Sequence, residues 1–138
     1  GVMLGYLDDP EATAETIDSD GWMRTGDVGI MDEDDYVRIT DRKKDMYISG
    51  GFNCYPAEIE KTLLQHPDIS DAAVIGMSDD RLGEVTQAHI VAKNLTAREV
   101  KSWAREQMAN YKVPRGIVFH DALPRNASGK IQKYLLKA

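Results

Sequence analysis

The chain has 138 residues, enough for one ordinary domain or for two small pieces joined by a linker. Its 17 Lys+Arg and 23 Asp+Glu give a formal net charge of −6, which argues against a nucleic-acid binder and an electrostatic membrane module. No apolar run approaches the roughly 20 residues of a membrane span, and the opening GVMLGYLDDPEA lacks the features of a signal peptide. We therefore expect a cytoplasmic protein. The single cysteine, Cys54, excludes an intramolecular disulfide and is expected to be a partly buried side chain.

Charge is distributed unevenly along the chain. Residues 1–41 hold 12 acids and 2 bases, whereas residues 42–138 hold 11 acids and 15 bases. The sign changes at the charged run DRKKD of residues 41–45, which we interpret as a linker outside any core. Residues 1–41 are too few and too acidic to fold alone. Together with the absence of an initiator Met, they indicate the tail of a larger domain that precedes this chain.

The first elements in chain order are a short helix and a β-hairpin. Asp9 and Pro10 are typical of a helix N-cap and first position, which predicts a helix that ends near Ile17. Residues 28–31 and 36–40 alternate as strands do, and the polar turn DEDD separates them. That turn lacks the glycine of a calcium-binding loop.

Residues 46–138 predict the order β-α-β-β-α-β-α. Strands are expected at residues 46–48, 69–77, 85–92 and 117–120. Helices are expected from Pro56, from the capping box that Thr96 and Glu99 form, and from Lys130 near the end. The fold class is therefore α+β, a small C-terminal sandwich with helices packed on a three- to four-stranded sheet, preceded by the β-hairpin tail.

Two other kinds of site are tested and rejected. A phosphate loop at Gly129-Lys130 is excluded, because Pro124 stands where the pattern needs glycine and Ile131 where it needs Ser or Thr. The histidines show no metal-ligand spacing, and we expect each to be isolated and either exposed or satisfied: His66, His89 and His120.

Three segments remain that ordinary structure does not explain. The first is GWMRTGD, in which Asp27 follows a glycine at a strand entrance and is placed to accept two hydroxyl hydrogen bonds. The second, TDRKKDMYISGGFNCYPAE at residues 40–58, joins the cationic linker to a Gly-Gly loop. The third, PRNASGKIQK at residues 124–133, carries Lys130 on a glycine loop that we expect to be mobile.

Together these segments resemble the adenylate-forming superfamily of acyl-CoA synthetases, nonribosomal-peptide adenylation domains and luciferases. The opening GYLDDPEATAET resembles the usual lead-in of the superfamily. The segments ISGGFNCYPAEIE and LPRNASGKIQK are most similar to the acyl-CoA ligases that take fatty, aryl or sterol-derived acids. Asp41 replaces the glycine that often precedes the arginine. The resemblance implies that residues 1–43 end a large N-terminal adenylation domain, that residues 44–138 form the mobile C-terminal domain, and that Lys44 is the hinge. The ATP loop and the acyl pocket are expected upstream, so the fragment alone is expected to be inactive.

The resemblance also implies an AMP-forming reaction with ATP and CoA as substrates and Mg²⁺ accompanying ATP. Lys130 is the expected catalytic residue, because an ammonium that bridges the carboxylate and the α-phosphate offsets their repulsion. Asp27 resembles the acceptor of the ribose diol, and Arg42 its partner at the ribose or phosphate. Ile39 is expected beside the nucleotide, and Asn53 within reach of a phosphate.

The second half-reaction is expected at the Gly-Gly loop after rotation about Lys44. Ser49, Gly50 and Gly51 are the expected CoA-binding residues, because glycines let the narrow pantetheine arm pass close to the backbone. The expected partners are a carboxylic acid, ATP, CoA and the missing N-terminal domain, with no nucleic acid and no integral membrane segment. Two alternatives stay open: an adenylation domain that loads a carrier protein, and a small non-catalytic α+β module that binds a nucleotide or a partner.

Overall fold

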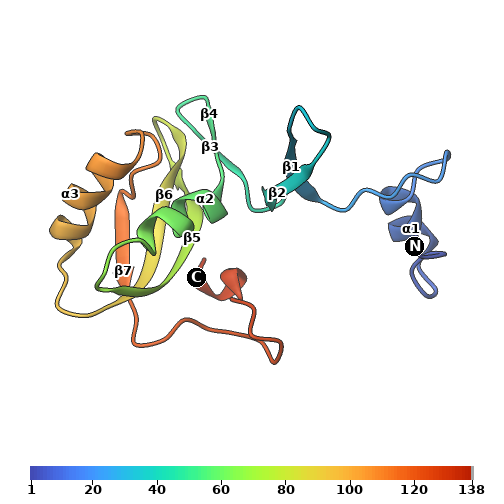
Figure 1. Ribbon diagram of the computed structural model, residues 1–138. Helices are drawn as coiled ribbons and strands as arrows, with labels where there is room; N and C mark the ends of the chain where they lie inside the picture. The colour runs from blue at the N-terminus through green and yellow to red at the C-terminus, as the bar shows by residue number, and fades with distance from the viewer. Residues whose placement is uncertain (138) are drawn as a thin grey trace.

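The computed structural model describes residues 1–137 (Figure 1). The elements are α1 (Pro10–Thr16), β1 (Asp27–Met31), β2 (Val37–Arg42), β3 (Tyr47–Ser49), β4 (Phe52–Cys54), α2 (Pro56–Leu63), β5 (Ile69–Asp79), β6 (Gly83–Ala92), α3 (Ala97–Gln107), β7 (Gly116–Phe119) and the 3-10 helix η1 (Lys133–Leu136). No helix among these residues is both long enough and apolar enough to cross a bilayer.

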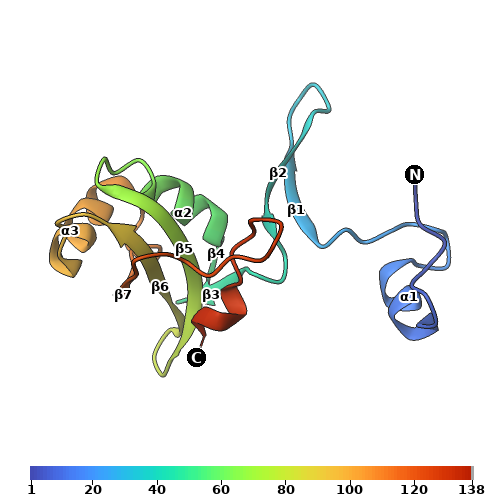
Figure 2. The same ribbon diagram turned by 90° about the horizontal axis from the view of Figure 1, so that it is seen from below.

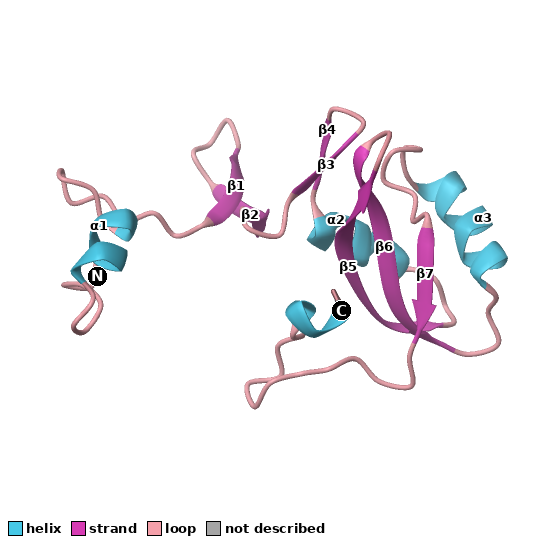
Figure 3. Cartoon of the chain, turned by 180° about the vertical axis from the view of Figure 1, so that it is seen from behind, coloured by secondary structure: helices cyan, strands magenta, loops and turns pink. Residues whose placement is uncertain are grey.

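Residues 1–43 extend away from the rest of the chain, with α1 at the far end and the β1–β2 hairpin between (Figures 1 and 3). Asp9 caps α1 by accepting a hydrogen bond from the Ala12 N–H at 2.9 Å, as the Asp9-Pro10 pair predicts. No residue of α1 is buried. Large apolar side chains lie exposed along this stretch, among them Val2, Leu4, Leu7, Trp22, Ile30, Met31, Tyr36, Val37 and Ile39.

Residues 46–137 form the predicted α+β sandwich on a mixed sheet. β6 runs antiparallel to β5 and parallel to β7, which α3 connects to it. β3 pairs antiparallel with the first residue of β6, through Ser49 and Gly83. β4 pairs with β3 at the edge of the sheet. The fold class is confirmed, but the sheet has five strands where the sequence predicts three or four. The sequence does not predict β4, because Phe52–Cys54 lie between the Gly-Gly turn and Pro56, residues that are typical of a loop.

Both faces of the central strands are buried. On one face, α2 and α3 pack against a core that includes Val74 and Ile90. On the other, Ala73 and Ile75 are covered by the C-terminal segment, through Leu123 and Leu136. Figure 2 shows that segment crossing the sheet on the side opposite α2 and α3. The buried Cys54 belongs to the first core, and burial raises its pKa, as expected of a packing thiol.

The expectations for Asp41 and for the start of the last helix are wrong. Asp41 is not part of a solvated linker: it belongs to β2, is 7% exposed, and its carboxylate accepts a hydrogen bond from the Ala57 N–H at the start of α2. The last helix does not begin at Lys130. Lys130 lies in a loop whose ends are bridged by Arg125 and Ile131, and η1 starts only at Lys133.

The histidines are not all isolated. His89 on β6 and His120 after β7 form a hydrogen bond between Nδ1 and Nε2 at 2.8 Å, because β6 and β7 run in parallel. His89 is 3% exposed, and its Nε2 has no hydrogen-bond partner among residues 1–137. Burial, and secondarily the nearby His120, lower the pKa of His89 below its ordinary value.

This pair predicts a loss of stability in acid. The unfolded chain binds a proton at His89 with a pKa of about 6.5, whereas the folded chain binds it only at lower pH. Stabilisation is therefore complete above the unfolded pKa and declines as the pH falls below it. In the full-length protein, thermal melting between pH 7.5 and 5.5, values that bracket the unfolded pKa of about 6.5, is expected to depend less on pH in His89→Gln than in wild type. His66→Gln is the control, and equal pH slopes in wild type and His89→Gln would contradict the prediction.

Candidate functional site

The β1–β2 hairpin brings Asp27 and Arg42 together. They are register partners at the open end of the hairpin, and the Arg42 Nε lies 3.0 Å from the Asp27 Oδ1. Both side chains remain accessible to solvent, at 26% and 55% exposure. The guanidinium orients one carboxylate oxygen and leaves further donors of its own for a ligand. The two side chains that the sequence predicts at one ribose therefore lie next to each other.

A cationic cleft of about 520 Å³ adjoins this pair. Thr25, Gly26, Arg42, Lys43 and Lys44 line it. The Lys43 N–H donates to the Gly26 carbonyl at 2.8 Å, which fixes the near wall of the cleft to the hairpin. Three cationic side chains at one opening attract an anion, and the cleft lies at the predicted hinge.

Ile39 faces a different cleft from the one that Arg42 lines. It is 59% exposed and lies between the hairpin and the start of α2, in a second cleft of about 520 Å³. Val28, Tyr55 and Ala57 are among the other lining residues. Ile39 is therefore available to a ligand or to another domain, but no described cavity joins it to Arg42.

Gly50 and Gly51 form the two-residue turn between β3 and β4. Their φ angles are +57° and +87°, which side chains other than glycine rarely adopt, so the turn itself requires both residues. A Cβ at Gly51 would meet no atom within 4 Å, so the space beside the turn is open. Ser49 is 2% exposed at the base of the turn, whereas Asn53 is exposed on β4, across from Ile48.

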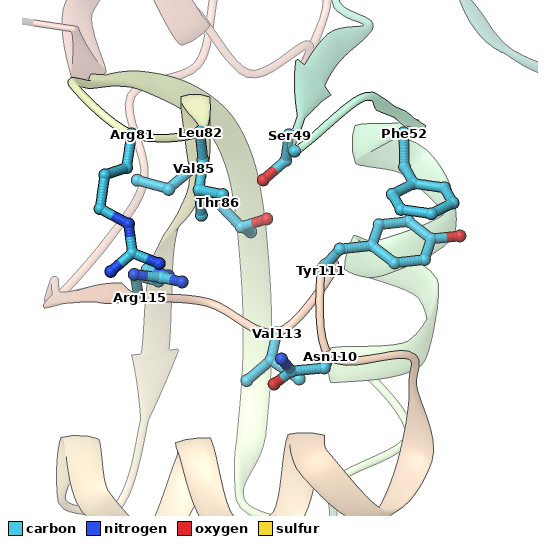
Figure 4. Close-up of a pocket in the computed structure, with 11 residues that line it drawn as sticks. Ser49, Phe52, Arg81, Leu82, Val85, Thr86, Asn110, Tyr111, Val113 and Arg115 are labelled. Carbon is cyan, nitrogen blue, oxygen red and sulfur yellow. The ribbon is translucent and has the colours of Figure 1, made fainter.

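A pocket of about 300 Å³ opens beside this turn (Figure 4). Ser49 and Gly50 form part of its wall. Arg81 and Arg115 supply its charge, and Phe52 stacks on Tyr111 with ring centroids 4.6 Å apart at its rim. Sequence analysis missed this pocket, because segments around residues 50, 81 and 115 contribute to it.

Lys130 lies exposed on a closely hydrogen-bonded loop. The Asn126 side-chain oxygen accepts from the N–H groups of Ser128 and Lys130, and the Asn126 N–H donates to the Lys130 carbonyl at 2.9 Å. Gly129 has φ +81°, so a tight turn requires this glycine whether or not the loop moves. Among residues 1–137 the Lys130 ammonium has no ion-pair partner.

Arg125 fixes this loop to the sheet. Its Nη1 donates to the Gly129 carbonyl at 2.7 Å, and its Nη2 lies 2.6 Å from the Asp71 carboxylate on β5. Figures 1 and 3 show the loop apart from the hairpin that carries Asp27. The structure therefore forms three separate groups: the Asp27–Arg42 pair, the Gly50–Gly51 turn with its pocket, and the Lys130 loop.

Residues 58–130 match the family model described as AMP-binding enzyme C-terminal domain. A curated relative from Rhodococcus jostii (strain RHA1) is 57% identical over 99% of this chain, and its name is 3-[(3aS,4S,7aS)-7a-methyl-1,5-dioxo-octahydro-1H-inden-4-yl]propanoyl:CoA ligase. The chain spans 27% of the length of that relative.

Two solved structures of MatB from Rhodopseudomonas palustris resemble this chain to different degrees. The ATP-bound form matches with a TM-score of 0.91 and 39% identity, over 99% of this chain and 28% of that one. The apo form matches with a TM-score of 0.69 and 40% identity, over 96% of this chain and 27% of that one. The arrangement of this chain is therefore closer to that of the ATP-bound form.

Proposed function

This chain belongs to the AMP-binding enzyme C-terminal domain family, and we propose on that premise that it is the C-terminal part of an ATP-dependent acyl-CoA ligase. The observation that carries the proposal is 57% identity, over nearly the whole chain, to a protein named as a CoA ligase. Residues 1–43 end the large N-terminal domain, and residues 44–138 form the mobile small domain. The exposed apolar side chains of residues 1–43 support this division, because they need a partner that lies outside this chain.

In the first half-reaction, a substrate carboxylate oxygen attacks the α-phosphorus of ATP. The bond to the β-phosphate oxygen breaks, and an acyl-adenylate and pyrophosphate result. Lys130 stabilises the charge that develops between the two anions. Asp27 accepts hydrogen bonds from the ribose hydroxyls while Arg42 orients its carboxylate. Ile39 and Asn53 are the further nucleotide-binding residues of this proposal, although Ile39 lines a separate cleft here and Asn53 lies beside the Gly50–Gly51 turn.

In the second half-reaction, rotation about Lys44 withdraws the Lys130 loop and brings the Gly50–Gly51 turn to the adenylate. The CoA sulfur attacks the acyl carbon, the bond to the AMP oxygen breaks, and the thiol proton passes to solvent. Ser49 and the two glycines border the pantetheine arm. The charge of the adjoining pocket supports this assignment, since Arg81 and Arg115 suit the phosphates of CoA.

Mg²⁺ is expected to accompany ATP in the first half-reaction. Among residues 1–137, no three His, Cys, Asp or Glu side chains converge on a point where they could hold a metal ion. When bound, Mg²⁺ would neutralise phosphate charge, and we assign none of these residues to it.

Replacement of Lys130 by alanine in the full-length enzyme tests the first half-reaction. ATP–pyrophosphate exchange is expected to fall about a hundred- to a thousandfold, because one preorganised cation is lost. Thioester formation from added acyl-adenylate is expected to continue. Lys137→Ala, which removes another exposed lysine of the tail, is the control. Wild-type exchange in Lys130→Ala would defeat the assignment and favour a non-catalytic binding module.

A large side chain at the Gly50–Gly51 turn tests whether the CoA thiol passes this turn in the second half-reaction. Gly51→Trp is expected to lower thioester formation by at least about a hundredfold, because the indole fills the open space beside the turn. Exchange is expected to stay near normal. Gly51→Ala is the control, since it imposes the same positive φ without the bulk. Equal loss of both half-reactions in Gly51→Trp alone would count against passage of the thiol here.

Replacement of Arg115 by a neutral side chain tests whether the pocket binds the phosphates of CoA. Arg115→Gln is expected to raise the KM for CoA about tenfold, because a charge-assisted hydrogen bond is lost. The KM for ATP is expected to be unchanged. Arg98→Gln, an exposed change on α3 away from the pocket, is the control. An unaltered KM for CoA in Arg115→Gln would contradict this role of the pocket. Wild-type activity on a phosphopantetheinyl carrier protein, with none on CoA, would instead favour the carrier-loading alternative.

A further inference from the structure

Asp41 makes a contact that spans the proposed hinge. Its carboxylate Oδ2 accepts a hydrogen bond from the Ala57 N–H at 2.9 Å, and its Oδ1 accepts from the Arg42 N–H. Asp41 lies on β2, before Lys44, whereas Ala57 lies on α2, after it. Among the hydrogen bonds and ion pairs of residues 1–137, this is the one side-chain contact that joins residues 1–43 to residues 46–137.

The start of α2 requires an acceptor from outside the helix. Pro56, the first helical residue, has no N–H, and Tyr55 provides no side-chain cap. The N–H groups of Glu58 and Ile59 both reach the Tyr55 carbonyl, which leaves the Ala57 N–H without a local acceptor. Helices usually satisfy this group with a residue of their own N-terminus. Here a buried carboxylate from the hairpin does so, and the hydrogen bond is present in this orientation of the two parts.

We propose that Asp41 is a positioning residue that holds the small domain in its adenylate-forming orientation by capping α2 across the hinge. This inference rests on the proposed function. The orientation that contains the bond is the one that matches ATP-bound MatB more closely than apo MatB. Rotation about Lys44 separates Asp41 from Ala57 and exposes both to water. Asp41 therefore acts on the balance between the two half-reactions, without touching a substrate.

The two half-reactions of the full-length enzyme test this role separately. In Asp41→Ala, ATP–pyrophosphate exchange is expected to fall about tenfold, the usual size of a lost cap. Thioester formation from added acyl-adenylate is expected to stay at the wild-type rate or to rise. Asp41→Asn keeps an oxygen for the Ala57 N–H and is expected to restore exchange. Asp45→Ala, which removes another acid of the same charged run, is the control.

A purely structural role predicts a different result. Loss of stability would lower both half-reactions equally in Asp41→Ala, and that result, or an unchanged ratio between them, overturns the proposal. Where Asp41→Ala does not fold, Asp41→Glu carries the same test, because its carboxylate is displaced by one methylene. If the wild-type enzyme exchanges pyrophosphate but Asp41→Ala leaves the ratio of the two half-reaction rates unchanged, only the role of Asp41 is overturned. A wild-type enzyme without exchange overturns the proposed function as well.

Discussion

Burial of both faces of β5 and β6 is the constraint on which the rest of the structure depends. One face is covered by α2 and α3, and the other is covered by residues that follow β7. Leu123 and Leu136 bury there, so the intervening chain must cross the sheet and turn back between them. Lys130 lies at that turn. The position of the proposed catalytic lysine is thus a consequence of core packing, and the Arg125–Asp71 ion pair fixes it further.

Sequence predicts those parts of the fold whose signals are local. The cap at Asp9, the capping box at Thr96, and the two-sided apolar pattern of β5 are each contained in a few consecutive residues. β4 was not predicted, because it lies between the Gly-Gly turn and Pro56, residues that are typical of a loop, and η1 begins at Lys133 where the sequence predicts a helix from Lys130. Asp41 was assigned to a linker because its neighbours are charged. Its burial is decided by an N–H sixteen residues later, which composition does not reveal.

The same distinction applies to the candidate site. Asp27, Arg42 and Lys130 were found because each lies in a recognisable segment, although only the hairpin register pairs the first two. The pocket at Arg81 and Arg115 depends on the packing of distant segments, and so does the contact between His89 and His120. The glycines at residues 50, 51 and 129 are explained by backbone conformation rather than by function alone. The loops at residues 50–51 and 129 suggested open backbone or flexibility, yet positive φ angles already require glycine there.

The proposed domain rotation is plausible because so little joins the two sides of Lys44. Each candidate group is held within one side by several bonds, whereas the Asp41–Ala57 hydrogen bond is the side-chain link between the sides among residues 1–137. Exchange of one such bond for bonds to water costs about 1 kcal/mol. A ligand shifts an equilibrium only by its different affinity for the two states. Because the contribution of this bond to the equilibrium is so small, modest differences in how ATP and CoA contact the two orientations suffice to select between them.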